Sequence, residues 1–137
     1  MMAALLTLWA LWALLNLALL LVTPYLIQEA NGPFTNGFKI VVPEGISDRV
    51  TPAELEAMLS HERGHIAHRH AIKNLFLSCL LIPRSRALYE QQEFEADDYA
   101  AARGHGPALA SAIRKLSSNA FDHYRASRLT KAATQPT

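Results

Sequence analysis

Two histidines four residues apart, His61 and His65, form the most informative chemical pattern in the sequence. On a helix, residues four apart project from the same face, so both imidazoles can bind one metal ion. Glu62 follows the first histidine and can reach a water bound to that ion, from which a carboxylate can take a proton. The pattern predicts one Zn²⁺ per chain and water-driven cleavage of amide bonds. The alternative is a helix that carries two histidines without binding a metal.

A catalytic zinc ion has three protein ligands and one position for water, so a third ligand must come from elsewhere in the chain. Glu93 is the better candidate. It shares a predicted helix face with Asp97, so that one carboxylate can bind the metal while the other holds a ligand histidine through its free ring nitrogen. An acidic helix face that is only solvated is the alternative, and Glu90 or Glu95 could also fill the role on spacing.

The other histidines near the motif are poorer candidates for the third ligand. A histidine six residues after His65 would be one solution, but Ala71 stands there. His68 lies one turn farther from the ion, and His70 is rotated from His65 by about 140° on a continuous helix. We expect both to be surface or core-edge histidines.

Helix start and stop signals surround these residues. Thr51–Glu54 combine a capping box with a proline at the first helical position, and apolar residues follow at helical spacing until Pro83. A second helix is expected over 85–103, closed by Gly104, and a third begins at Gly106. The predicted metal ligands therefore lie on two helices.

A short strand is expected over Phe38–Val42, which is rich in β-branched residues and bounded by Gly37 and Pro43. An edge strand beside a zinc site could pair with an extended substrate. The alternative is a strand that only covers the helix.

Residues 3–22 form an uncharged apolar stretch of about 20 residues, enough to cross ~30 Å of hydrocarbon. A cleaved signal peptide is the competing interpretation, but no basic residue precedes the stretch and no small-x-small site stands ahead of Pro24. We predict a single-pass membrane anchor over residues 1–23. Lys39, the first basic residue after it, favours a cytoplasmic location for the domain that follows.

A second apolar stretch, Leu75–Ile82, is too short to span a bilayer by itself. It either extends the active-site helix into the core or rests on the membrane surface, and we favour the core because the helical pattern continues. Cys79 within it is the single cysteine of the chain, so no intrachain disulfide points to an oxidising compartment.

Length and charge limit the remaining possibilities. Apart from the anchor, about 110 residues are enough for one small core, which we assign to a metallopeptidase domain over residues 24–128. The net charge of +1 gives no case for nucleic acid as a partner. The polar tail, residues 129–137, is expected to be disordered.

The motifs together resemble the gluzincins, metallopeptidases with HExxH on one helix and Glu-x-x-x-Asp on the next. Within them, Leu59–His70, Glu93–Asp97 and residues 98–116 are most similar to the HtpX and CAAX prenyl-protease family of membrane-bound peptidases. Residues 33–38 and 40–43 are similar to BlaR-type peptidases. The short spacing between the two motifs resembles that of the minigluzincins, which are reduced soluble relatives.

This resemblance implies a role for each matching residue. His61, His65 and Glu93 correspond to the zinc ligands and Glu62 to the general base, while Asp97 corresponds to a residue that orients a ligand histidine. A zincin-like fold and cleavage of protein or peptide substrates at a membrane are also implied.

The chain departs from the family pattern in two places. Arg63 stands where the families have an apolar or small residue. Many HtpX-like proteases stabilise the oxyanion with a histidine and an arginine near the C-terminus. His123 and Arg128 could be the counterparts here, but their spacing is one residue short and Tyr124 replaces the usual proline, so we favour an ordinary surface histidine at position 123.

The sequence therefore predicts a mainly α (α+β) protein. A transmembrane helix precedes a small zincin-like domain with an HExxH helix, a glutamate-bearing helix and a short edge strand. The predicted function is that of a membrane-anchored zinc endopeptidase. The alternative is a zinc-binding membrane scaffold or regulator, descended from a peptidase, that is catalytically silent or latent.

Overall fold

The computed structural model describes residues 2–26 and 31–134. Over these residues the protein is mainly helical with one small hairpin, so the predicted fold class is confirmed. The elements follow one another along the chain as α1 (Met2–Leu26), β1 (Phe34–Thr35), β2 (Ile40–Val41), α2 (Ile46–Arg49), α3 (Pro52–Ala67), α4 (His70–Cys79), α5 (Arg86–Ala101), α6 (Gly106–Leu116) and α7 (Ala120–Thr134).

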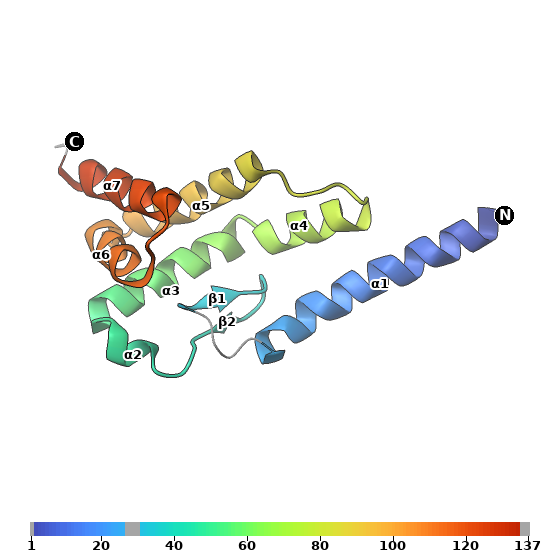
Figure 1. Ribbon diagram of the computed structural model, residues 1–137, viewed down its shortest axis with the longest axis horizontal. Coiled ribbons are helices and arrows are strands. Elements are labelled where there is room, and N and C mark those ends of the chain that lie inside the picture. The colour runs from blue at the N-terminus through green and yellow to red at the C-terminus, as the bar shows by residue number, and fades with distance from the viewer. Residues whose placement is uncertain (1, 27–30, 135–137) are drawn as a thin grey trace.

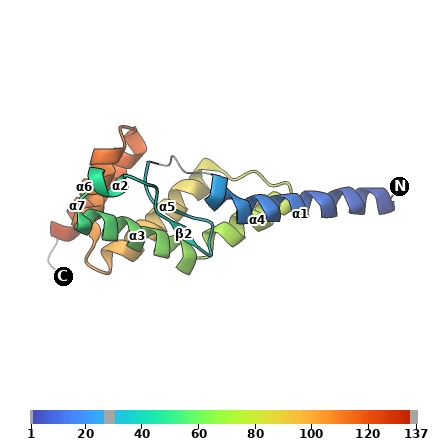
Figure 2. The ribbon, with the colours of Figure 1, turned by 90° about the horizontal axis from the view of Figure 1, so that it is seen from below.

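The N-terminal helix α1 extends away from the rest of the molecule, which gathers at its C-terminal end (Figures 1 and 2). By length and composition, Met2–Thr23 could cross a membrane. Its large apolar side chains are mostly exposed, as a lipid-facing helix requires. Among the described residues of the domain, α4 is the helix that packs beside it.

The close packing of α3 on α5 depends on Gly64, the glycine inside the histidine motif. A Cβ atom at this position would lie 2.9 Å from Cα of Ala96 and 3.0 Å from Cβ of Tyr99. Any larger residue would therefore push the two helices apart. The absence of a side chain brings the two predicted ligand-bearing helices into direct contact.

A small, alanine-rich core joins these helices to α6 and α7. Leu109 on α6 and Leu129 on α7 are its largest members, and they pack with Ala57, Ala100, Ala110 and Ala126. The prediction of a disordered tail from residue 129 is wrong for the described part, because α7 continues to Thr134 and Leu129 is buried. Residues 135–137 lie outside the described residues.

The continuous helix expected up to Pro83 is interrupted after the histidine motif. Arg69 adopts a left-handed conformation with φ 55°, which ends α3 and starts α4 in a new direction. A non-glycine residue pays on the order of 1 kcal/mol for this conformation, so the surrounding contacts must hold it in place. The break re-aims His70, with consequences for the metal site.

The second apolar stretch does not enter the core. Phe76 is 63% exposed and Leu81 is 69% exposed, and Leu80 and Ile82 are exposed as well. The core interpretation of Leu75–Ile82 is therefore wrong. The helical spacing of apolar residues is the same whether they face the protein core or another apolar environment, so it could not distinguish the two.

The predicted strand is present but shorter, as β2, and it pairs antiparallel with β1 in a two-stranded hairpin. Phe34 lies opposite Val41, and Thr35 lies opposite Ile40. Asn36 closes the turn, because its side-chain oxygen accepts hydrogen bonds from the backbone N–H groups of two following residues. The strand that contacts the predicted site is β1, not the expected segment 38–42.

The capping box at Thr51 is present, and its glutamate also connects α3 to α6. The Glu54 carboxylate accepts hydrogen bonds from the Thr51 N–H at 2.7 Å, Ser111 Oγ at 2.6 Å and Lys115 Nζ at 2.7 Å. These bonds, above all the one from Lys115, lower the pKa of Glu54 to about 2. The lowered pKa stabilises the fold at pH values above the ordinary glutamate pKa, and this contribution is lost as the pH falls toward 2.

Replacing Glu54 by glutamine is expected to lower the free energy of unfolding by roughly 2 kcal/mol at pH 7, because a buried charged network is broken. The difference from wild type should be about half as large at pH 3, where the wild-type carboxylate has already lost much of its advantage. Thermal unfolding of the detergent-solubilised protein at both pH values measures this, with the exposed Glu44→Gln as control. Equal losses at both pH values would contradict the assignment.

Candidate zinc site

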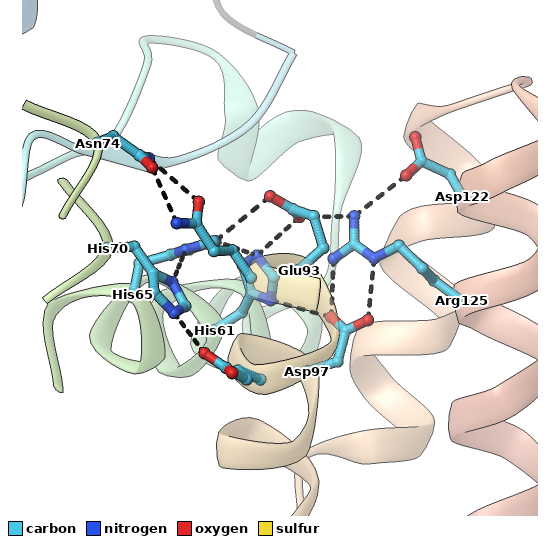
Figure 3. Close-up of polar contacts among 10 residues, drawn as sticks. His61, His65, His70, Asn74, Glu93, Asp97, Asp122 and Arg125 are labelled. Atoms are coloured by element: carbon cyan, nitrogen blue, oxygen red, sulfur yellow. Dashed lines mark hydrogen bonds and ion pairs between the residues drawn. The ribbon is translucent and has the colours of Figure 1, made fainter. Parts of the chain in front are cut away.

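The α3–α5 contact brings the predicted metal ligands together. The Nε2 atoms of His61 and His65 lie 3.1 Å apart. Glu93 reaches across from α5, with Oε2 at 3.5 Å from His61 Nε2 and Oε1 at 3.6 Å from His65 Nε2. Glu62 belongs to the same group, with a carboxylate oxygen within 4.8 Å of both histidines. Figure 3 shows the side chains of His61, His65 and Glu93 converging between the helices.

This donor set fits zinc. In a tetrahedral site with bonds of about 2.0–2.1 Å, neighbouring ligand atoms lie about 3.3 Å apart. The three distances among His61, His65 and Glu93 bracket that value. Two imidazoles and one carboxylate are also the donor types that catalytic zinc takes, leaving one position for water.

The outer nitrogen of His61 faces a buried acid. His61 Nδ1 lies 3.0 Å from Asp97 Oδ1. Arg125 on α7 donates two hydrogen bonds to the same carboxylate, from Nε at 2.9 Å and from Nη2 at 2.7 Å. Its Nη1 lies 3.0 Å from Glu93 Oε2 and donates to Asp122 at 3.1 Å. One arginine therefore fixes both acidic residues of the α5 motif (Figure 3).

The outer nitrogen of His65 faces a residue that sequence reasoning had set aside. Because the chain turns at Arg69, His70 Nδ1 lies 2.8 Å from His65 Nδ1. His70 Nε2 lies 2.8 Å from Glu95 Oε2. If His65 binds a metal through Nε2, its Nδ1 carries the proton and donates to His70, which in turn donates to Glu95. The tautomers of His65 and His70 that these hydrogen bonds require are thus compatible with each other.

The predicted base, Glu62, is buried at the edge of the site. Burial raises its pKa to about 7; the charge of Glu93 adds to the rise, while the charge of His61 is the largest opposing effect. A general base works best when its pKa lies near the working pH, so this environment suits a group that takes up and returns a proton.

The charges around the two motif histidines favour a proton on His61 and a neutral His65. Burial lowers the pKa of His61, but Asp97 and Glu93 outweigh it and raise this pKa to about 9. The pKa of His65 falls to about 3, first because it is buried and then because His61 is charged. A metal ion would take over the role of the His61 proton, since imidazole ligands must be neutral to bind.

Two clefts meet at the site. The first, about 470 Å³, lies between α1, α4 and β1 and is lined by Leu19, Thr35 and Asn74 among others. The second, about 390 Å³, lies toward α6 and α7 and is lined by Leu109, Ile113 and Arg125 among others. Both clefts are bounded by Glu62 and Glu93, so an extended chain could pass over the predicted metal position.

The remaining candidates lie elsewhere. Glu90 pairs with Arg86 near the surface, and Glu95 pairs with His70 rather than with the two motif histidines. Arg63, the departure from the family pattern, points outward to Glu56. This arginine therefore leaves the interior of the site unchanged.

The two residues considered for an oxyanion role lie outside the site. His123 is exposed on α7, and Arg128 pairs with Asp98 at 2.6 Å. The arginine that enters the site from α7 is Arg125, three residues before Arg128. On a helix, residues 125 and 129 share one face, and in α7 both are buried. This spacing is the signal by which Arg125 could have been identified from the sequence.

Comparison with known proteins yields a partial match. Residues 28–89, just under half of the chain, match the model of peptidase family M48. The match includes His61, Glu62 and His65 and ends before Glu93. Protease HtpX homolog 2 of Methanosarcina acetivorans is 48% identical over 40 residues, which are 29% of this chain. The matched segment spans only 14% of that relative's length. No solved structure gives a significant match.

The family match and the curated relative agree with the motifs read from the sequence. The family match lies over the segment that carries the two histidines and the glutamate between them. The resemblance of this chain to the HtpX-like metallopeptidases of family M48 is thereby confirmed.

Proposed function

We propose that the protein is a membrane-anchored zinc endopeptidase. The observation that carries the proposal is the convergence of His61, His65 and Glu93 at tetrahedral spacing beside the buried Glu62. The peptidase domain begins at residue 24 and, since α7 packs into its core, extends through that helix. The segment 1–23 is the single-pass anchor, and the domain faces the cytoplasm.

In this proposal, each side chain has a defined task. A zinc ion held by the two histidines and Glu93 would polarise the scissile carbonyl and activate a water molecule for attack. Glu62 accepts the proton of that water and passes it to the leaving amine. Asp97 holds the ring of His61, and Arg125 holds Asp97 and Glu93 in place.

His70 is assigned the corresponding task for His65. Replacing His70 by alanine is expected to weaken zinc affinity about 10- to 100-fold, because the ligand ring loses its partner. Glutamine at this position can accept from His65 and donate to Glu95, so His70→Gln should recover part of the loss. Competition with a chromophoric chelator measures the affinity, with the exposed His123→Ala as control. Affinity unchanged in His70→Ala would show that the contact does not orient the ligand.

Cleavage of an unfolded protein such as casein by the purified full chain tests the function. The proposal requires activity that disappears on treatment with a chelator and returns on addition of zinc. Zinc bound at one per chain without any cleavage would instead favour the zinc-binding scaffold or a latent enzyme. The buried Glu62 favours the peptidase, because a scaffold has no use for a carboxylate beside the metal.

A further inference from the structure

The C-terminal part of α4 and the turn after it form an apolar projection, here called the α4 tip and comprising residues 75–82. It contains no charged residue, while Lys73 precedes it and Arg84 follows it. Phe76, Leu80, Leu81 and Ile82 are exposed although they are large and apolar. A contiguous exposed patch of this kind marks contact with another apolar surface.

The carbonyl groups at the C-terminal end of α4 have partners within the protein. The last four carbonyls of a helix lack partners within it and are normally solvated. In α4, the carbonyls of residues 76–78 accept bonds from the backbone N–H groups of Leu80, Leu81 and Ile82. The Cys79 carbonyl accepts a bond from Trp9 Nε1 at 2.7 Å. These four carbonyls are therefore paired, which lowers the cost of placing the end of the helix in hydrocarbon.

The hydrogen-bond partners of the α4 tip are side chains from within the length of α1. Trp12 Nε1 donates to the Ser78 carbonyl at 2.9 Å, and Ser78 Oγ donates to Asn16 Oδ1 at 2.6 Å. Trp9, Trp12 and Asn16 all lie within Met2–Thr23, the candidate membrane span. At 1.5 Å per residue, Trp9 lies about 21 Å along the helix from Thr23, well inside a bilayer core of ~30 Å.

We infer that the α4 tip inserts into the hydrocarbon of the bilayer beside α1, as a re-entrant segment that enters and leaves on the same side. The inference rests on the proposed membrane anchoring by α1. Continuity with the apolar surface of α1 argues for lipid as the occupant. Lys73 and Arg84 flank the uncharged segment, and their long side chains can extend toward the headgroups. The first cleft, lined by α1 and α4, is then held at the membrane surface.

Site-directed fluorescence in lipid vesicles tests the insertion with the full chain. Replacing Cys79 by serine removes the single thiol, and Phe76→Cys then carries an environment-sensitive fluorophore. Tyr124→Cys on α7 is the matched control, because Tyr124 is an aromatic residue with a similar exposure of 60%. Leu11→Cys reports separately on the anchor. The vesicles contain brominated phospholipids, and iodide is the water-soluble quencher.

The label at position 76 is expected to be quenched by brominated lipid at least threefold more strongly than the label at position 124, and to be shielded from iodide. Equal quenching at the two positions would overturn the insertion. Shielding from iodide without lipid quenching would also overturn it, since protein would then cover the tip. Lipid quenching at position 11 without quenching at position 76 would overturn the insertion of the α4 tip and leave the membrane anchor intact. No readout depends on peptidase activity, so the result is separate from the proposed chemistry.

Discussion

Replacing Glu62 by glutamine is expected to lower casein cleavage by about 10³-fold, the loss typical of removing a general base, while zinc content stays unchanged. The glutamine side chain has the same size, but its amide cannot take a proton from water. Because Glu62 is not one of the three predicted ligands, the metal should remain in place. Burial raises the pKa of the native carboxylate, which can accept and return a proton where the amide cannot.

Glu56→Gln is the matched control for this substitution. Glu56 lies on the same helix but is exposed and pairs with Arg63 at the surface. Its replacement should leave both cleavage and zinc content at the wild-type level. Wild-type turnover by Glu62→Gln would remove this residue from the mechanism, whatever the control does.

Replacing Glu93 by glutamine is expected to weaken zinc binding by at least about 100-fold and to abolish cleavage with it. A neutral amide is a poor zinc ligand, whereas carboxylate, imidazole and thiolate are good ones. Glutamine retains the volume and can still contact Arg125, so the fold should survive. Zinc per chain, measured by mass spectrometry after dialysis, gives the result.

Two neighbouring substitutions separate Glu93 from its alternatives. Glu90 lies one turn earlier on α5, where it pairs with Arg86, and Glu95 pairs with His70. Glu90→Gln should keep its zinc in full, and Glu95→Gln should lose affinity only through the orientation of His65. Full zinc in Glu93→Gln together with loss in either neighbour would move the third ligand to that residue.

The helices that carry the site could be predicted from local signals. The capping box at Thr51, the serine cap before α5 and the glycine after it are short-range features whose physics is the same in any fold. The spacing of His61, His65 and Glu93 could likewise be translated into shared helix faces. The predicted starts of the two ligand-bearing helices and the end of the second therefore agree with the structure, whereas the continuous helix expected up to Pro83 does not.

The contacts between segments could not be predicted in the same way. His70 reaches His65 only because Arg69 takes a left-handed conformation, and neither glycine nor proline marks that break in the sequence. Arg125 lies 28 residues from Asp97, on a helix whose position depends on the packing of Leu129. Such features arise from tertiary structure, which residue spacing does not encode.

The apolar stretch after the motif shows a related limit. Its helical pattern fits burial in protein as well as burial in lipid, because both environments favour the same side chains. The exposed side chains of Phe76 and Leu81, with the Trp9 bond to the end of α4, distinguish the two possibilities. The sequence alone could not show that side chains of a distant helix donate hydrogen bonds to the end of α4.

Zinc content and zinc X-ray absorption of the purified full chain test the central claim most directly. We predict one zinc per chain, surrounded only by nitrogen and oxygen at about 2.0–2.1 Å, with the scattering pattern of two imidazoles. A sulfur neighbour at about 2.3 Å would place the metal on Cys79, the single thiol, and would contradict the assignment. A purified chain that binds no zinc would contradict it equally.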